Sequence, residues 1–293
     1  LYHHDSLKHP IENFHVICLD DYHKKYIEKY YPHIKSVTVC PMTGELAFGQ
    51  DKIDWDNFEN RKYDIVFTGT YTDPTRIESA IHKIPKFLAE NVYELIDLLL
   101  SDSSMTIENA VDILAENEIY DYINSDKPLH TQSFYLADAY VRSLNRKKLV
   151  QALDLSGHKI DLFGSLWDEL NLKNANLHRE IPFNLTFTIF AKSKISVNIM
   201  PNFKAGSHDR VFSSQLNGAV SLTDPTILLT NQYKDGENIL FFSLDDMQTA
   251  CDAVDDVLSN PDKLKKIAQA GNEIALQNHT WTNIAKVLLK TIG

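Results

Sequence analysis

The sequence predicts an α/β protein built on a doubly wound parallel sheet, with a helical insertion and part of a preceding lobe. Two observations support this prediction. Short apolar runs of the strand type alternate with helical segments over most of the chain, which is the pattern of β-α-β units. The alternation is interrupted at about 77–153, where apolar residues recur almost wholly at helical spacing. That stretch is too long for a simple crossover, so we expect an insertion.

Composition excludes several classes of protein. The 293 residues are 43% hydrophobic and 24% charged, which is typical of a globular chain with a sizeable core. The formal net charge of −11 argues against a nucleic-acid partner, because phosphate backbones are bound by basic patches. Three cysteines stand at wide spacing without a C-x-x-C pattern, so we expect a reducing, cytoplasmic setting. We expect neither a signal peptide nor a transmembrane segment, since no apolar run approaches the roughly 20 residues that cross a bilayer.

The first part of the chain predicts the remnant of another lobe. Residues 14–19 form a short apolar run, a polar and aromatic helix follows, and residues 37–40 are a second β-branched run. The chain also begins at Leu1 in the middle of what resembles a motif, so we expect a fragment of a longer protein. We therefore predict a truncated N-terminal lobe at 1–55 and a second lobe, which carries the insertion, at 56–293.

The second lobe contains strand signals that alternate with helices. We expect these strands at 64–67, 159–163, 194–199, 218–223 and 239–242. In doubly wound sheets, ligands bind at the C-terminal ends of the strands. Residues that follow four of these strands are therefore candidates for a ligand-binding crevice: Gly69, Gly164, Pro201 and Asp224.

The segment from Lys204 to Arg210 offers an anion site. A strand ends before it, a Gly-Ser turn follows, and a helix is expected to start at about Ser207. Free N–H groups at a helix start attract anions, and Lys204, His208 and Arg210 surround this start in an otherwise acidic chain. A diphosphate would suit the site. The alternative is that Ser207 only caps the helix, Asp209 favours its start, and the basic side chains are solvated.

Three other candidate positions each have a ligand-binding and a structural interpretation. Asp224 can accept a hydrogen bond from a sugar or ribose hydroxyl, or it can be the turn residue of an Asp-Pro pair. Gly69 and Thr70, followed by Arg76 at the start of the next helix, can bring backbone N–H groups to a phosphate, but many α/β loops contain one glycine. Trp167 can pack on a base or in the core, and the core is favoured.

Several common sites have no support in the sequence. There is no G-x-G-x-x-G, no P-loop and no G-x-S-x-G motif, which argues against dinucleotide-dependent dehydrogenases or epimerases, P-loop NTPases and elbow-type hydrolases. His3, His4 and His9 cluster near the start, but neither they nor any H-E-x-x-H pattern predicts a metal site. We therefore expect no bound metal.

Seven short segments together resemble a known family. In order, they are Thr68-Gly69-Thr70 with Arg76, Leu-Phe-Gly-Ser-Leu-Trp-Asp-Glu at 162–169, Ser-Lys-Ile-Ser-Val-Asn-Ile-Met at 193–200, Gly-Ser-His-Asp-Arg-Val-Phe at 206–212, Asn-Gly-Ala-Val-Ser-Leu-Thr-Asp at 217–224, Lys-Asp-Gly-Glu-Asn-Ile-Leu-Phe at 234–241 and Asn-His-Thr-Trp at 278–281. This order is similar to the C-terminal half of CgeB-type glycosyltransferases, the spore-maturation-like relatives of the group 1, or family 4, enzymes. The resemblance covers about 60–290, and residues 1–4 and 17–20 look like the end of that family's N-terminal domain.

The resemblance implies a GT-B fold, in which two Rossmann-like lobes face a cleft and the C-terminal lobe holds a nucleotide-sugar donor. It implies transfer of the sugar to a hydroxyl of a glycan, protein or small-molecule acceptor, as in bacterial cell-envelope or spore glycosylation. It also implies retention of configuration, no metal requirement and no cofactor beyond the donor itself. On the matching positions, the donor-binding residues would be Gly69, Thr70, Arg76, Lys204, Ser207, His208, Asp209, Arg210 and Asp224.

One position departs from the family pattern. Many relatives place a glutamate that can hold the ribose directly after the Phe of the motif, and here that position is Ser213. The nearest carboxylates in this stretch of sequence are Asp209 and Asp224. A non-catalytic nucleotide- or sugar-binding module therefore stays open beside a working transferase. In a working enzyme, Lys204, His208 and Arg210 would stabilise the leaving diphosphate. The general base is not identified, and His208 is the candidate for a catalytic role.

Overall fold

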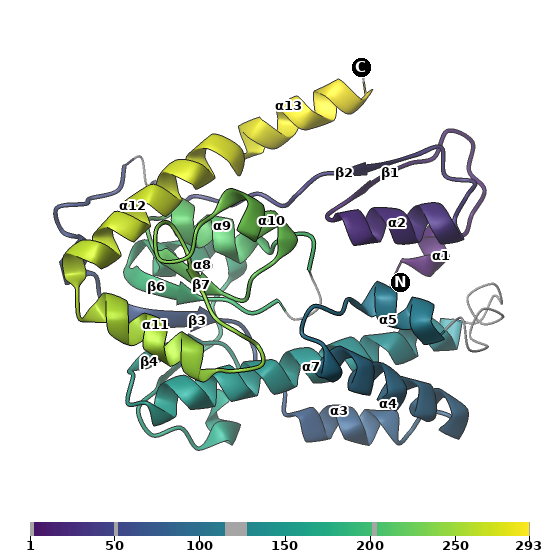
Figure 1. Ribbon diagram of the computed structural model, residues 1–293, viewed down its shortest axis with the longest axis horizontal. Coiled ribbons are helices and arrows are strands. Elements are labelled where there is room, and N and C mark those ends of the chain that lie inside the picture. The colour runs from purple at the N-terminus through teal and green to yellow at the C-terminus, as the bar shows by residue number, and fades with distance from the viewer. Residues whose placement is uncertain (1–2, 50–51, 115–127, 201–203, 293) are drawn as a thin grey trace. The chain divides into compact units, whose positions relative to one another are not determined.

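The computed structural model describes residues 3–49, 52–114, 128–200 and 204–292, which form two compact units (Figure 1). Unit 1 consists of Leu1–Pro41, Thr72–Leu144 and Pro201–Gly206, and unit 2 of Met42–Tyr71, Asn145–Met200 and Ser207–Gly293. Residues 115–127 of the predicted insertion, and Pro201 of the predicted crevice, lie outside the described residues. The predicted division at residue 55 concerns the lobes of a longer protein and stays a prediction.

Unit 2 is built on a parallel sheet of six described strands in the order β5-β4-β3-β6-β7-β8. The strands are β3 Tyr63–Thr68, β4 Ile160–Phe163, β5 Asn176–His178, β6 Ser193–Val197, β7 Val220–Thr223 and β8 Leu240–Phe241. In chain order this is the 3-2-1-4-5-6 arrangement of doubly wound folds. The predicted α/β fold class is confirmed, and the order of strands reverses between β3 and β6.

Apolar residues on both faces of this sheet fix its position in the core. Ile65 and Phe67 of β3 belong to a cluster that also contains residues of α7 (Pro128–Leu155), α11 (Gln248–Leu258) and α12 (Pro261–Asn278). Val66, between them, points to the opposite face, where it packs with Phe187 and Phe190 of α8 (Phe183–Ala191). A strand that is buried on both faces reads as a continuous apolar run, which is why these strands could be predicted.

One strand of the sheet escaped prediction. The edge strand β5 has the sequence Asn-Leu-His, in which only Leu177 is apolar and that side chain is exposed. Its pairing with β4 supplies the structure that its own residues do not indicate. A short, polar edge strand is typical of sheets that must avoid pairing with other chains.

The helices of unit 2 begin and end at recognisable residues. α9 spans Asp209–Leu216, and Gly218 follows it with a φ of +77°, the left-handed conformation that ends many helices. α12 begins at Pro261, and the Asn260 side chain caps it by accepting the Lys263 N–H at 3.1 Å. The remaining described helices of the unit are η1 Phe58–Asn60, η3 Trp167–Leu170, α10 Ile227–Gln232 and α13 Trp281–Ile292.

Unit 1 combines a small parallel pair with helices. β1 His15–Cys18 pairs with β2 Ser36–Val39, and α2 Asp21–Tyr30 joins them. The other described helices are α1 His4–Leu7, α3 Pro74–Ile81, α4 Lys86–Ser101, α5 Ile107–Leu114 and the first part of α7. The apolar side chains of α4 are buried against α5 and α7. Of the helices that the structure describes, none is long and apolar enough to cross a membrane.

Candidate functional site

The candidate site lies where the strand order of unit 2 reverses. β3 ends at Thr68 and β6 ends at Val197, and the two strands are direct neighbours in the sheet. In folds of this type, the chain segments that follow the two strands at such a point leave toward opposite sides of the sheet and open a crevice. The residues that follow β3 and β6 are therefore the first candidates for ligand contact: Gly69, Thr70 and Asn198.

The turn after β3 is locked against the turn after β4. The Gly69 N–H donates to the Phe163 carbonyl at 2.8 Å, and the indole N–H of Trp167 donates to the Gly69 carbonyl at 2.8 Å. A Cβ on Gly164 would lie 2.2 Å from the Gly69 carbonyl oxygen, so only glycine fits there. Trp167 is buried against Tyr71 and Phe67, which makes it a core residue. The turn is rigid, and Gly69 already uses both of its backbone polar groups.

Arg146 reaches this turn from the last part of α7. Its guanidinium donates to the Thr70 carbonyl at 2.6 Å and lies 5.4 Å from the centre of the Phe67 ring. Nothing in the sequence singled it out, because it stands in a long helical stretch among other basic residues. Only the fold brings it to the end of β3.

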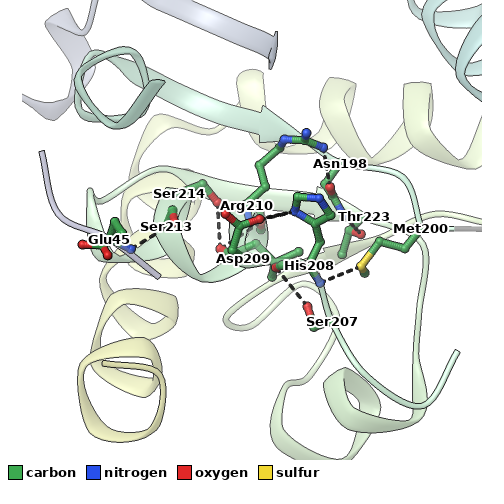
Figure 2. A network of polar contacts seen from close by, with 12 residues as sticks. Glu45, Asn198, Met200, Ser207, His208, Asp209, Arg210, Ser213, Ser214 and Thr223 are labelled. Atoms are coloured by element: carbon green, nitrogen blue, oxygen red, sulfur yellow. Dashed lines mark hydrogen bonds and ion pairs between the residues drawn. The ribbon is translucent and has the colours of Figure 1, made fainter. Parts of the chain in front are cut away.

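Arg210 reaches the same ring from α9. Its guanidinium donates to the side-chain oxygen of Asn198 at 2.8 Å (Figure 2). It also lies 5.6 Å from the centre of the Phe67 ring. Burial lowers the pKa of Arg210 and the charge of Asp209 opposes that shift, but the guanidinium stays protonated at any physiological pH. Arg146 and Arg210 thus place two positive charges within about 6 Å of the centre of one aromatic ring.

The start of α9 differs from the expectation. The helix begins at Asp209 rather than at about Ser207, and its N-cap is His208, whose ring nitrogen accepts the Arg210 N–H at 3.2 Å. The His208 N–H donates to the sulfur of Met200 at 3.0 Å, and the Val211 N–H donates to the His208 carbonyl at 3.1 Å. Three N–H groups near the helix start are therefore engaged within the protein. An anion at this helix start would therefore have to be attracted by side-chain charge more than by free backbone N–H groups.

His208 and Asp209 form a close pair at this start (Figure 2). Packing around the imidazole and the charge of Arg210 lower the pKa of His208 and the carboxylate opposes them, although 45% of the His208 side chain is exposed. Burial alone would raise the pKa of Asp209, but His208 and Arg210 hold it below its usual value. The Nδ1 atom of His208 donates to Asp209 when it carries a proton and accepts the Arg210 N–H when it does not.

Asp224 is placed at the neighbouring strand end, where it is fully buried. Its carboxylate accepts the Met200 N–H at 2.5 Å and so ties the end of β7 to the segment after β6. The side chain of Thr223, one residue earlier, accepts the Asn198 amide N–H at 3.0 Å. These contacts hold the ends of β6 and β7 in register beneath Arg210.

Ser213 lies one turn into α9 and is fully buried. Its hydroxyl accepts the Glu45 N–H at 3.0 Å, and the Gly44 N–H donates to the His279 carbonyl at 2.9 Å. Asn217 completes the contact, because its amide donates to the Glu45 carbonyl at 2.8 Å. Glu45, which the sequence did not associate with this position, is therefore a carboxylate-bearing residue in direct contact with Ser213.

The predicted donor-binding residues are divided between the two units. Gly69, Thr70, Ser207, His208, Asp209, Arg210 and Asp224 belong to unit 2. Arg76, exposed in the first turn of α3, and Lys204, which is buried, belong to unit 1. A shared role for residues of the two units stays a prediction. Among the residues that the structure describes, no group of three or more His, Cys, Asp or Glu side chains is arranged to hold a metal ion.

Comparisons with solved structures identify the fold. Sucrose-phosphate synthase from Thermosynechococcus elongatus is 11% identical with a TM-score of 0.51, over 95% of this chain and 57% of that one. A single-residue mutant of TarM from S. aureus is 10% identical with a TM-score of 0.51, over 94% and 43%. A glycosyltransferase from Rickettsia africae is 9% identical with a TM-score of 0.51, over 96% and 63%. The chain spans less than two thirds of each of these proteins, and it shares their GT-B type of α/β fold.

Sequence comparison identifies the family. A search of the curated proteins finds no match. The family described as glycosyl transferase-like matches residues 142–290, which is a little over half of the chain and includes every strand of unit 2 except β3. Arg146, Asn198, His208 and Arg210 all lie within the matched region. The chain therefore belongs to the glycosyl transferase-like family.

Proposed function

We propose that unit 2 binds the diphosphate of a nucleotide-sugar at the ends of β3 and β6, and that the whole enzyme transfers the sugar to an acceptor hydroxyl. One observation carries the proposal: Arg146 and Arg210, from different helices, both lie over the ring of Phe67 at this point. In a chain with a net charge of −11, two guanidiniums beside one ring form a local concentration of positive charge.

Guanidinium groups suit a diphosphate for two reasons. Each can give two parallel N–H groups to phosphate oxygens, which adds direction to the charge attraction. Each guanidinium is also held in place by one of its own N–H groups, which donates to the Thr70 carbonyl in Arg146 and to the Asn198 amide oxygen in Arg210. A pre-oriented cation loses little conformational freedom when the ligand binds.

The proposed reaction breaks the bond between the anomeric carbon of the sugar and an oxygen of the diphosphate. The electron pair of that bond stays on the diphosphate, the acceptor oxygen bonds to the anomeric carbon, and the proton of the acceptor hydroxyl passes to a base. Negative charge therefore grows on the leaving group in the transition state, where Arg146 and Arg210 stabilise it. His208, at the start of α9, is a group of unit 2 that can donate or accept a proton beside Arg210.

Several finer features belong to the same proposal. We infer a CgeB-type enzyme that retains configuration, needs no metal and no cofactor beyond its donor, and glycosylates a glycan, protein or small molecule of the bacterial envelope or spore. The ordered motifs around 193–200 and 206–212 support the subfamily. The three free, buried cysteines support a cytoplasmic setting. Activity that survives a chelator, and a product with the donor's anomeric configuration, are the expected results.

A second candidate function is a non-catalytic nucleotide- or sugar-binding module. Ser213 favours it, because the position where relatives carry a ribose-holding glutamate is here closed by the Gly44-Glu45 backbone. The two candidates differ in turnover: only the transferase releases a nucleoside diphosphate from the donor in the presence of an acceptor.

Thermal denaturation with a panel of nucleotide-sugars tests the proposal. UDP-sugars come first, because TarM, which shares the fold, was solved with UDP. We expect at least one nucleotide-sugar to raise the melting temperature, and Arg210→Ala to abolish the rise. Arg142→Ala is the matched control, since Arg142 lies one turn earlier on α7 and pairs with Asp138 at 3.0 Å. The donor site would be rejected if no nucleotide-sugar raised the melting temperature, or if the rise were equal in the Arg210→Ala variant and the wild type.

A further inference from the structure

We infer that Asn198 is a positioning residue that aims Arg210 at the diphosphate without cancelling its charge. The inference rests on the proposed function, because it concerns the same phosphate site. It assigns a role to a buried residue whose amide is engaged within the protein and which acts through Arg210.

The side chain of Asn198 is fixed in one orientation. Asn198 is fully buried, and its backbone N–H donates to the Leu222 carbonyl of the next strand at 2.8 Å. Its amide N–H donates to the Thr223 hydroxyl oxygen at 3.0 Å. Because the nitrogen of the amide is occupied by Thr223, the oxygen is the atom that faces Arg210, and it accepts the guanidinium N–H at 2.8 Å.

The guanidinium of Arg210 is confined on its other sides as well. It lies over the Phe67 ring at 5.6 Å, and its second terminal nitrogen is 3.8 Å from the point where a Cβ of Gly69 would stand. Asn198 thus completes a frame around a long side chain that would otherwise lose considerable rotamer freedom on binding. Figure 2 shows Arg210 extending from α9 toward the amide of Asn198.

The neutrality of Asn198 is the second half of the inference. An amide oxygen orients a guanidinium through a hydrogen bond and leaves its positive charge available. A carboxylate at the same 2.8 Å would form a buried ion pair, and the charge would then be compensated before any phosphate arrived. The charge of the neighbouring Asp209 acts on Arg210 and opposes the lowering of its pKa, but the ion pair of Asp209 is with His208. Arg146 adds a second positive charge at the Phe67 ring.

Calorimetric titration with UDP and with uridine tests the inference, since only UDP carries the diphosphate. Asn198→Asp keeps the shape of the side chain and the acceptor oxygen. We expect it to weaken UDP binding by about 10- to 100-fold and uridine binding by less than about twofold. Asn198→Ala is expected to weaken UDP binding by about tenfold, and to have no further effect when Arg210→Ala is already present.

A matched control separates positioning from general stability. Asn272 of α12 is also a buried asparagine, and its amide donates to the Gln215 carbonyl at 2.9 Å. Asn272→Ala should lower the melting temperature while the ratio of UDP to uridine affinity stays at the wild-type value. The inference is overturned if Asn198→Asp binds UDP as the wild type does, or if Asn198→Ala still weakens UDP binding in the Arg210→Ala background. A wild-type protein that binds no nucleoside diphosphate would reject the proposed function itself.

Discussion

The hydroxyl of Ser213 accepts a hydrogen bond from the backbone N–H of Glu45 at 3.0 Å, and so joins α9 to a segment far away in sequence. The fit is tight, because a Cβ on Gly44 would lie 2.6 Å from the Ser213 nitrogen. Because Ser213 is also fully buried, a larger side chain at this position must displace its neighbours.

Ser213→Glu is expected to destabilise the protein, because the longer, charged side chain must displace the segment around Gly44 and Glu45. We expect a loss of about 2–3 kcal/mol, whereas Ser213→Ala removes one hydrogen bond and costs about 1 kcal/mol. Chemical denaturation monitored by circular dichroism compares the two. A glutamate variant as stable as the wild type would show that the segment around Gly44 and Glu45 can move without a measurable cost in stability.

Gly164→Ala is expected to disturb the phosphate site from a distance. The added methyl group would meet the Gly69 carbonyl at 2.2 Å, so the turn after β3 must shift, and Arg146 is anchored to the next residue of that turn. We expect a loss of roughly 2–3 kcal/mol in stability and weaker nucleotide binding. Gly157→Ala is a control, because its glycine also has a positive φ but has open space around it. Equal effects on nucleotide binding would contradict the coupling.

His279 gives the stability of unit 2 a defined pH dependence. It stacks on Phe212 at 3.6 Å, its ring nitrogen contacts the Gln232 side chain at 2.7 Å, and burial lowers its pKa to about 4. The unfolded chain takes up this proton near pH 6.5 and the folded chain only near pH 4, so the stabilisation is complete above pH 6.5 and is lost as the pH falls toward 4.

The expected loss over this window is about 3 kcal/mol, the free energy of a shift of this size. His279→Phe keeps an aromatic ring between Phe212 and Tyr233 and removes the titration. The free energy of unfolding, measured by denaturation at pH 7, 5.5 and 4.5, should therefore fall more steeply with decreasing pH for the wild type than for the variant. Parallel curves would show that His279 does not titrate in this way.

Residue patterns predicted most of the sheet but not all of it. β3, β4, β6 and β7 are buried on both faces, so continuous apolar runs marked them in the sequence. β5 offers no such run, because it is three residues long and stands at the edge, where pairing with β4 decides its structure. The order of the strands, and with it the position of the crevice, is a long-range property that local patterns do not contain.

The candidate site likewise depends on long-range contacts that local sequence patterns do not contain. A basic helix start was predicted at Gly206-Ser207, and the structure places a helix start two residues later, with His208 as its unusual cap. Arg146 could not be predicted, because a basic residue in a helix is usually solvated and only the packing of α7 brings it to Phe67. Asn198 could not be singled out either, because the sequence placed it inside the expected strand at 194–199 and only the fold brings it to Arg210.

The difference in affinity between a nucleoside diphosphate and its nucleoside tests the central claim most directly. Titration calorimetry with UDP and uridine, and with GDP and guanosine, would compare the wild type, Arg142→Ala and the double variant Arg146→Ala/Arg210→Ala. If the two guanidiniums hold the diphosphate, one pair should differ by at least about 100-fold in the wild type and in Arg142→Ala, and by less than about threefold in the double variant. A gap that persists unchanged in the double variant would contradict the account.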